Sequence, residues 1–280
     1  MKTGLLLAGG AMRGMYTAGV LDIFLDNQIT VDGMIGISAG AVFGVNFLSR
    51  QRGRVIRYNK RFNGDRNYMG IKPLLCTGNI VDTELAYHIV PRELDRFDDE
   101  MFQASGVPFY AGITCVETGK AELVKIDSVF EQMDVLRASA SMPFVSRPVR
   151  INGQHYLDGD IADGLPYQKM SAMGYDRLIV VLTRETGYRK KPVSSAMVRM
   201  CYGKHKEFAA ELLSRHERYN SSVKELEKLQ KKGSVYMIAP SEPIAIKRIE
   251  KDPDRLQQVY ELGLRDGMAA VDELKDFLKN

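Results

Sequence analysis

The sequence predicts an α/β protein whose central sheet is mainly parallel and is covered by helices. Two short apolar segments near the N-terminus, residues 5–8 and 34–37, each lead through small residues into a segment with helical periodicity. Further short apolar runs recur along the chain, and two long amphipathic segments lie in its last third. Short apolar strands that alternate with helices are typical of a parallel sheet with helices on its faces.

The first four elements follow in order from the N-terminus. Residues 5–8 are apolar and precede Gly9-Gly10, which indicates a buried strand that enters a tight loop. Apolar residues at helical spacing then predict a helix over residues 12–27. A second strand over residues 34–37 ends at Ser38, and residues 39–45 follow as a mostly apolar helix.

The later elements are predicted from the same two periodicities. Short apolar runs predict strands over residues 109–116, 123–126, 155–157, 178–182 and 235–239. Apolar positions every three or four residues predict a long polar helix from Phe208 to a stop at Gly233, and a final helix after Asp252-Pro253. Because the sequence shows no internal repeat or linker, we expect residues 1–280 to form a single domain.

Composition excludes several classes of protein. The net charge of +4 is too small to indicate a nucleic-acid partner, and the three cysteines are too few and too widely spaced for a disulfide framework. We therefore expect a cytoplasmic protein. The apolar start is interrupted by glycines and Arg13, unlike a signal peptide, and no apolar run is long enough to span a membrane. Contact with a membrane would be peripheral.

The segment Gly36-Ile37-Ser38-Ala39-Gly40 is the first candidate for chemistry. It is a Gly-x-Ser-x-Gly pattern at a predicted strand-to-helix turn, which is the setting of a nucleophilic serine in esterases. Glycines on both sides leave room for the sharp turn, and the following helix directs free N–H groups toward Ser38. The alternative is that Ser38 only caps the helix.

The segment from Gly9 to Gly14 lies at the other predicted strand-to-helix turn. It lacks the second glycine of a dinucleotide fingerprint, and it lacks the lysine and hydroxyl residue of a P-loop. Consecutive glycines allow backbone N–H groups to converge on an anion, so we interpret the loop as an oxyanion hole. The candidate residues are Gly9, Gly10, Ala11, Met12 and Arg13. Arg13 could also anchor the loop, hold an anionic substrate or lie on the surface.

A nucleophilic serine needs a base, and a histidine or a carboxylate can serve. None of the four histidines, His88, His155, His205 and His216, carries a catalytic signature in its flanking sequence. Asp158-Gly159-Asp160 follows the predicted strand at residues 155–157, and burial would raise the proton affinity of such a carboxylate. Asp158 is therefore the preferred base, with His155 as the alternative.

Taken together, these segments resemble the patatin-like phospholipases. That family carries a glycine-rich loop, a Gly-x-Ser-x-Gly turn and a later Asp-Gly-Gly or Asp-Gly-Ala, in this order. Residues 138–143, Ala-Ser-Ala-Ser-Met-Pro, also resemble the small-residue segment that precedes the family's aspartate. The resemblance covers residues 3–185 as the catalytic core, and residues 186–280 resemble the helical extensions of bacterial members.

The resemblance implies a three-layer α/β/α fold and hydrolysis of lipid or other acyl esters. By position, Ser38 is the nucleophile and Asp158 the base of a dyad without histidine, with residues 9–13 as the oxyanion loop. It implies no metal and no cofactor, and no sequence feature specifies an oligomeric state. Ala11 replaces a family glycine, Asp160 replaces a small residue, and Asp163 stands where asparagine is frequent. The alternative is therefore an impaired or non-catalytic module that binds an anionic lipid or metabolite.

Two further segments bear on membrane contact. Residues 50–66 contain seven basic residues, Arg50, Arg52, Arg54, Arg57, Lys60, Arg61 and Arg66, against one acidic residue. They predict either contact with an anionic membrane surface or a solvated face with internal ion pairs. The apolar residues between Met197 and Tyr202 predict a core helix or a flexible lip for acyl chains.

Overall fold

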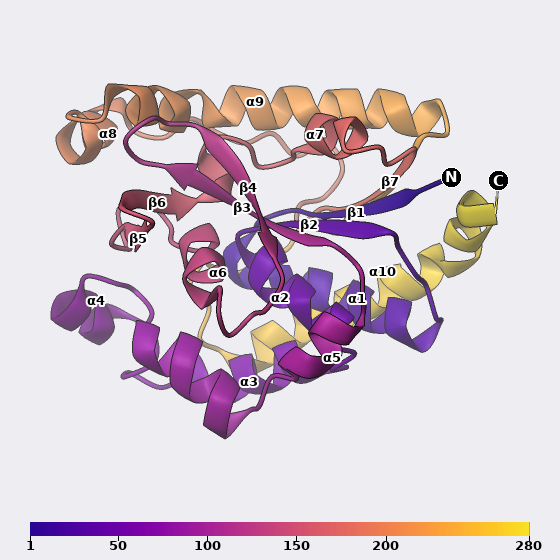
Figure 1. Ribbon diagram of the computed structural model, residues 1–280, viewed down its shortest axis with the longest axis horizontal. Coiled ribbons are helices and arrows are strands. Elements are labelled where there is room, and N and C mark those ends of the chain that lie inside the picture. The colour runs from indigo at the N-terminus through magenta and orange to yellow at the C-terminus, as the bar shows by residue number, and fades with distance from the viewer. Residues whose placement is uncertain (280) are drawn as a thin grey trace.

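One mixed eight-stranded sheet forms the centre of the protein in the computed structural model, which describes residues 1–279 (Figure 1). The strands are β1 (Thr3–Leu7), β2 (Gly33–Ile37), β3 (Phe109–Cys115), β4 (Ala121–Ile126), β5 (Val149–Ile151), β6 (Gln154–Asp158), β7 (Arg177–Val181) and β8 (Val235–Ile238). Their order is β5-β6-β3-β2-β1-β7-β8, with β4 paired to β3. The pairs β3-β2, β2-β1, β1-β7 and β7-β8 are parallel. The pairs β3-β4, β3-β6 and β5-β6 are antiparallel.

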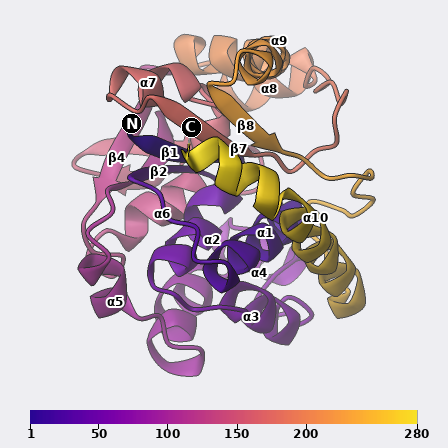
Figure 2. The same ribbon diagram turned by 90° about the vertical axis from the view of Figure 1, so that its right-hand side faces the viewer.

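Helices cover both faces of the sheet, as Figures 1 and 2 show. One layer contains α1 (Met15–Asp26), α2 (Ala39–Leu48), α3 (Arg54–Phe62), α4 (Ile71–Thr77), α5 (Asp99–Ala104), α6 (Met133–Ser139) and α10 (Pro253–Lys279). The other contains α7 (Tyr167–Ala172), α8 (Ser195–Tyr202) and α9 (Lys206–Lys231). Short helical segments are η1 (Ala11–Gly14), η2 (Leu85–Leu94) and η3 (Gly159–Ile161). The predicted three-layer α/β/α fold is confirmed.

The chain differs from the predicted elements mainly between the second and third strands. Residues 54–104 hold three α-helices and the π-helical segment η2, none of which the sequence predicted. These elements are short, and Pro91 lies inside η2, so their helical periodicity is weak. The two long C-terminal helices were predicted with nearly their observed bounds, because apolar periodicity over many turns is a strong signal.

The C-terminal helix α10 packs closely against α1. Gly19 of α1 and Gly263 of α10 lie where the two helices cross, and a Cβ atom on either would overlap backbone of the other helix. The hydroxyl of Tyr260 donates a 2.6 Å hydrogen bond to Asp22 Oδ2 in the same buried contact. The first and last helices therefore share one packed layer. The single domain and its division at residue 185 stay predictions.

Strand β3 brings the ends of two other strands together. β4 pairs with β3 over most of its length and occupies one edge. β2 and β6 therefore share the opposite edge, where Ile37 pairs with Gly112 and Asp158 pairs with Ile113. Because Gly112 and Ile113 are consecutive, the carboxyl ends of β2 and β6 meet at one point of the sheet.

Candidate active site

Ser38 lies in a sharp and strained turn between β2 and α2. Its φ of 56° and ψ of −123° fall in a region that residues with a side chain rarely adopt. The flanking glycines are required by space, because a Cβ on Gly36 would lie 2.7 Å from the nitrogen of Ala41, and one on Gly40 would overlap Leu7. The sequence pattern thus correctly predicts the sharp strand-to-helix turn at Ser38.

The hydroxyl of Ser38 donates a 2.7 Å hydrogen bond to Asp158 Oδ2. It makes no capping hydrogen bond to α2, so the capping role considered from the sequence is not observed. The small-residue segment at 138–143 holds both partners: the Ser38 amide donates to Ser139 Oγ at 2.9 Å, and the Asp158 amide donates to the Ser141 carbonyl at 2.9 Å.

The carboxyl group of Asp158 is suited to exchange a proton near neutral pH. Burial, followed by the charge of the neighbouring Asp160 carboxylate, raises its pKa to about 6, although Arg215 and the Ser38 hydroxyl oppose the increase. Its Oδ1 accepts a 2.9 Å hydrogen bond from the Asp160 amide, which leaves Oδ2 directed at Ser38. A carboxylate with a raised pKa is a better proton acceptor than an ordinary aspartate.

Asp160 is neutralised by two cations that the sequence did not indicate. Lys190 Nζ lies 2.8 Å from Asp160 Oδ1, and Arg215 on α9 contacts both the carboxylate and the backbone carbonyl of Asp160. Although burial opposes it, these cations hold the pKa of Asp160 below its usual range. Asp163 is 3.4 Å from Lys169. Asp160 and Asp163 are therefore paired with separate cations, whereas the carboxylate of Asp158 accepts hydrogen bonds from Ser38 and the Asp160 amide.

The glycine-rich loop packs directly against Ser38. A Cβ on Gly9 would lie 2.9 Å from the Ser38 Cβ, and the Gly9 carbonyl accepts a 2.7 Å hydrogen bond from Thr183 Oγ1. Ala11 has a φ of 49°, the left-handed conformation for which glycine is favoured. Within residues 1–279, the amides of Gly9, Gly10 and Ala11 donate no hydrogen bond to the protein.

The remaining two residues of the predicted oxyanion loop have other partners. The Met12 amide donates to the carbonyl of Arg248 at 3.3 Å, and the Arg13 amide donates to that of Gly10 at 3.2 Å. Arg13 is buried, so it is not the surface arginine considered from the sequence. Of the five loop residues, Gly9, Gly10 and Ala11 are therefore the ones whose N–H groups are free to bind an oxyanion.

The histidines lie away from this point. His155 Nδ1 is 2.8 Å from Glu117 Oε1, and His155 precedes Asp158 by three positions on β6, so its side chain extends from the opposite face of the strand. His216 Nδ1 lies 2.9 Å from the Leu213 carbonyl. No histidine lines either cavity that reaches Ser38 in the described part of the chain.

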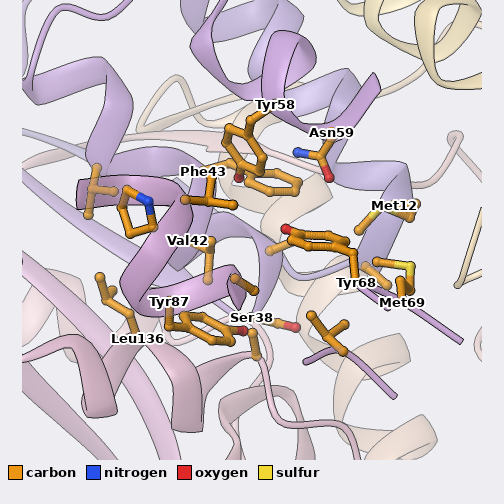
Figure 3. A pocket seen from close by; sticks show the side chains of 18 of the residues that line it. Met12, Ser38, Val42, Phe43, Tyr58, Asn59, Tyr68, Met69, Tyr87 and Leu136 are labelled. Atoms are coloured by element: carbon orange, nitrogen blue, oxygen red, sulfur yellow. The ribbon is translucent and has the colours of Figure 1, made fainter. Parts of the chain in front are cut away.

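A largely apolar cavity extends from Ser38 between α2 and α6 on one side and segments of residues 54–97 on the other (Figure 3). Figure 3 shows the rings of Tyr58, Tyr68 and Tyr87 around it, with Ser38 at its edge. Its empty space, open mouth included, is about 1030 Å³. The sequence did not predict this cavity, because much of its wall comes from short segments with weak periodicity.

A second, polar cavity opens on the other side of Ser38. Both cavities include Ala11, Ser38, Met142 and Arg248 in their walls. The second is completed by charged side chains, among them Arg13, Arg184, Lys190 and Arg215. Ser38 therefore lies between an apolar compartment and a cationic one.

Three of the seven basic residues at positions 50–66 form ion pairs within the protein. Arg52 contacts Asp26 at 2.7 Å, Arg57 contacts Asp95 at 2.7 Å, and the buried Arg54 contacts the same Asp95. This arrangement favours the alternative of internal ion pairs over a membrane patch. In the segment 197–202, Val198 and Tyr202 are buried, whereas Met197 and Met200 are exposed.

The fold and this site define a class of α/β proteins that present a serine between a glycine-rich loop and a buried aspartate. A family model described as patatin-like phospholipase matches residues 5–170, which is more than half of the chain. The protein belongs to the patatin-like phospholipase family. Residues 205–279 match a second model, described as a domain of unknown function (DUF6363).

Several curated proteins are similar over much of this chain. "Uncharacterized protein YjjU" of Escherichia coli K12 is 27% identical, over 94% of this chain and 75% of its own length. "Probable lipid hydrolase 463L" of Invertebrate iridescent virus 6 is 24% identical over 66% of this chain and 71% of its own. "Lysophospholipase NTE1" of Yarrowia lipolytica is 25% identical over 98% of this chain, which spans 20% of that protein.

Among solved structures, VipD from Legionella pneumophila matches 97% of this chain and 67% of its own. Its TM-score is 0.48 and its sequence identity 13%. In residues 1–279, no helix has the length and apolar character needed to cross a bilayer.

Proposed function

We propose that this protein hydrolyses the carboxylic ester bonds of lipids through an acyl-enzyme on Ser38, with Asp158 as the base. The observation that carries this proposal is the 2.7 Å hydrogen bond from the strained Ser38 hydroxyl to a buried carboxylate of raised pKa. The family and the names of relatives, lipid hydrolase and lysophospholipase, support the class of reaction.

The reaction begins when Asp158 Oδ2 takes the Ser38 proton as Oγ attacks the ester carbonyl. The resulting oxyanion is stabilised by the N–H groups of Gly9, Gly10 and Ala11. Collapse of the intermediate expels the alcohol, which receives the proton from Asp158 and leaves the acyl group on Ser38. Asp158 then deprotonates a water that attacks the acyl ester, and the proton returns to Ser38 as the acid leaves.

The apolar cavity supports an acyl chain as the group bound beside Ser38. Its walls are largely apolar, and Met12, Val42 and Leu136 line it together with the tyrosines (Figure 3). Burial of methylene groups in such a cavity stabilises binding by about 0.8 kcal/mol per group. We expect longer acyl chains to bind more tightly until the cavity is filled.

The proposal is tested by covalent labelling with a fluorophosphonate together with hydrolysis of p-nitrophenyl acyl esters. We expect the wild-type protein to be labelled at Ser38 and Ser38→Ala to be neither labelled nor active. Equal hydrolysis by the two proteins would exclude Ser38 as the nucleophile. Anion binding without labelling or turnover would instead favour a non-catalytic module.

Peripheral contact with an anionic membrane stays a proposal, and we locate it on α4 and the nearby Arg66 rather than on the rest of residues 50–66. Ile71 and Leu75 of α4 are 73% and 80% exposed, and they share a hollow with Arg66, Lys72 and Lys251. The combination of exposed apolar and basic side chains fits an anionic lipid surface.

The position of α4 also supports this proposal. The segments on either side of the helix are joined by the Gly70 amide, which donates a 2.8 Å hydrogen bond to the Ile80 carbonyl. The adjoining Met69 and Ile80 line the apolar cavity. A membrane that contacts α4 would therefore lie at the rim of the cavity proposed for the acyl chain.

A further inference from the structure

The cationic cavity beside Ser38 contains basic side chains that have no role in the steps described above. Its walls carry five basic side chains, Arg13, Arg184, Lys190, Arg215 and Arg248, and two carboxylates, Asp158 and Asp160. Lys190 and Arg215 are both committed to Asp160. The other three basic side chains remain to be explained.

Arg13, Arg184 and Arg248 have no acidic partner within residues 1–279, and their guanidinium groups donate no hydrogen bond there. Arg13 is only 9% exposed, and its buried Nε atom has no hydrogen-bond partner. An unpaired buried cation is costly, so such a group indicates an anion that is supplied from outside the chain.

The three guanidinium groups act on one another electrostatically. Burial, followed by the charges of Arg184 and Arg248, lowers the pKa of Arg13 to about 10. Arg184 is held over the ring of Tyr188, with its Cζ 4.4 Å from the ring centroid. Repulsion among cations is relieved when a phosphate binds between them, and the planar fork of arginine suits phosphate oxygens.

The position of the cavity identifies which part of a substrate would carry that phosphate. If the acyl chain occupies the apolar cavity, the alcohol part of the ester points away from it. The second cavity shares Ala11, Ser38 and Met142 with the first, so it receives the group on the alcohol side. A glycerol ester places a phosphate only a few bonds from the attacked carbonyl.

We propose that the cavity lined by Arg13, Arg184 and Arg248 is a headgroup subsite, and that it selects lipid esters whose alcohol carries a net negative phosphate. This inference rests on the proposed hydrolase function. It distinguishes an anionic headgroup from the zwitterionic and neutral headgroups that an acyl cavity alone would accept.

The experiment compares lysophosphatidic acid with a monoacylglycerol of the same acyl chain, which differs from it by the phosphate. We expect kcat/KM of the wild-type protein to be at least about tenfold higher for the phosphorylated lipid, since a charge-assisted hydrogen bond contributes about this much. Arg184→Gln and Arg248→Gln should each lower that ratio severalfold. Arg184→Lys, which keeps the charge without the fork, should lower it less than Arg184→Gln.

Arg150→Gln serves as the control, because Arg150 is an exposed arginine on β5 outside both cavities. The ratio of kcat/KM for lysophosphatidic acid to kcat/KM for the monoacylglycerol should be the same in Arg150→Gln as in the wild-type protein. A wild-type ratio near one, or a ratio that Arg184→Gln and Arg248→Gln leave unchanged, overturns the headgroup subsite.

Binding to Ser38→Ala separates this proposal from the proposed function. Calorimetry should show that Ser38→Ala binds lysophosphatidic acid more tightly than the monoacylglycerol, and that adding Arg184→Gln removes the difference. This result supports the subsite even if the wild-type protein and Ser38→Ala show the same turnover. Equal turnover would contradict only the proposal that Ser38 is the nucleophile of a hydrolase. Inorganic phosphate that binds as tightly as the lipid would identify a free-phosphate site and overturn the headgroup assignment.

Discussion

Ser38 and Asp158 are separated by 120 positions in the sequence, yet their side chains lie 2.7 Å apart because β2 and β6 end side by side on β3. Ile37 pairs with Gly112 and Asp158 pairs with Ile113, so the contact is fixed by backbone register. A shift of either strand by one residue would turn its side chains to the other face of the sheet. The rigidity of the sheet is therefore what positions the two groups.

The first prediction concerns the base. Asp158→Asn keeps the shape of the side chain but removes its ability to accept the Ser38 proton, so we expect kcat for p-nitrophenyl esters to fall by about 10³ or more. His155→Ala removes a side chain paired with Glu117 and should change kcat less than about twofold. Steady-state kinetics of both variants provide the measurement. A large loss in His155→Ala with an active Asp158→Asn would reverse the assignment.

The second prediction concerns pH. Asp158 acts as a base only when it is deprotonated, and its pKa is raised to about 6, so kcat/KM should fall as pH decreases through about 6. Asp160→Asn removes the neighbouring negative charge and leaves the positive charges of Lys190 and Arg215 without their acidic partner. Both effects favour the charged form of Asp158, so the acidic limb should move to lower pH. The pH dependence of kcat/KM in the two proteins tests this shift.

Lys190→Met provides the opposite case. Loss of this cation leaves the Asp160 carboxylate less neutralised beside Asp158, so the acidic limb should move to higher pH. Shifts in the same direction in Asp160→Asn and Lys190→Met would contradict the electrostatic explanation. Thermal melting of both variants serves as the control for folding, because breaking a buried ion pair costs about 3–5 kcal/mol.

The third prediction concerns Ala11, where the family carries glycine. A φ of 49° destabilises a residue that has a side chain by roughly 1–2 kcal/mol. Replacement by glycine removes this strain but costs about 0.5–1 kcal/mol, because glycine loses more conformational entropy on folding. We therefore expect Ala11→Gly to raise the free energy of unfolding by up to about 1 kcal/mol and to keep its esterase activity. Urea unfolding and ester hydrolysis test both points. A loss of activity would show that the Ala11 methyl is required at the junction of the cavities.

The fourth prediction concerns the turn that holds Ser38. A Cβ on Gly40 would lie 2.8 Å from the carbonyl carbon of Leu7, which belongs to a central strand that cannot move. Gly40→Ala should lower the free energy of unfolding by about 1–3 kcal/mol, the range for overpacking in a core. Gly64→Ala is the matched control, because a Cβ there has no atom closer than 3.9 Å. Equal stabilities of the two variants would contradict the steric requirement.

The sequence was sufficient to predict the residues whose local pattern carries the signal. Gly36, Ser38 and Gly40 form a recognisable turn, and Asp158 follows a strand beside a glycine. The sequence could not predict that Lys190, Arg215 and Arg248 lie beside the site, because a lysine or arginine in a polar segment usually lies in solvent. Arg215 reaches Asp160 through the packing of α9 against η3, and Lys190 reaches it from the loop between β7 and α8.

The walls of the apolar cavity were missed for a related reason. Many of them come from short segments between residues 54 and 97, whose apolar residues have too few helical turns to show a period. The basic residues of the same region suggested a membrane patch, whereas Asp26 and Asp95 lie far enough along the chain that their pairing depends on the fold.

The last prediction concerns α4. If Ile71 and Leu75 enter a lipid surface, the double change Ile71→Asp and Leu75→Asp removes two apolar contacts and adds two negative charges beside Lys72. Since burial of one such side chain contributes about 1.5–3 kcal/mol, we expect binding to phosphatidylglycerol vesicles to fall at least tenfold. Vesicle sedimentation at low and high salt provides the measurement, and wild-type binding should weaken with salt because basic side chains contribute.

Met173→Asp is the control for this experiment. Met173 is also an exposed apolar residue, at 37%, but it follows α7 on the other face of the sheet (Figure 1). It should bind vesicles as the wild-type protein does. If both variants lose binding equally, the effect comes from added negative charge rather than from α4. If neither does, α4 is not the surface that contacts lipid, and the acyl chain must reach Ser38 without the membrane at this rim.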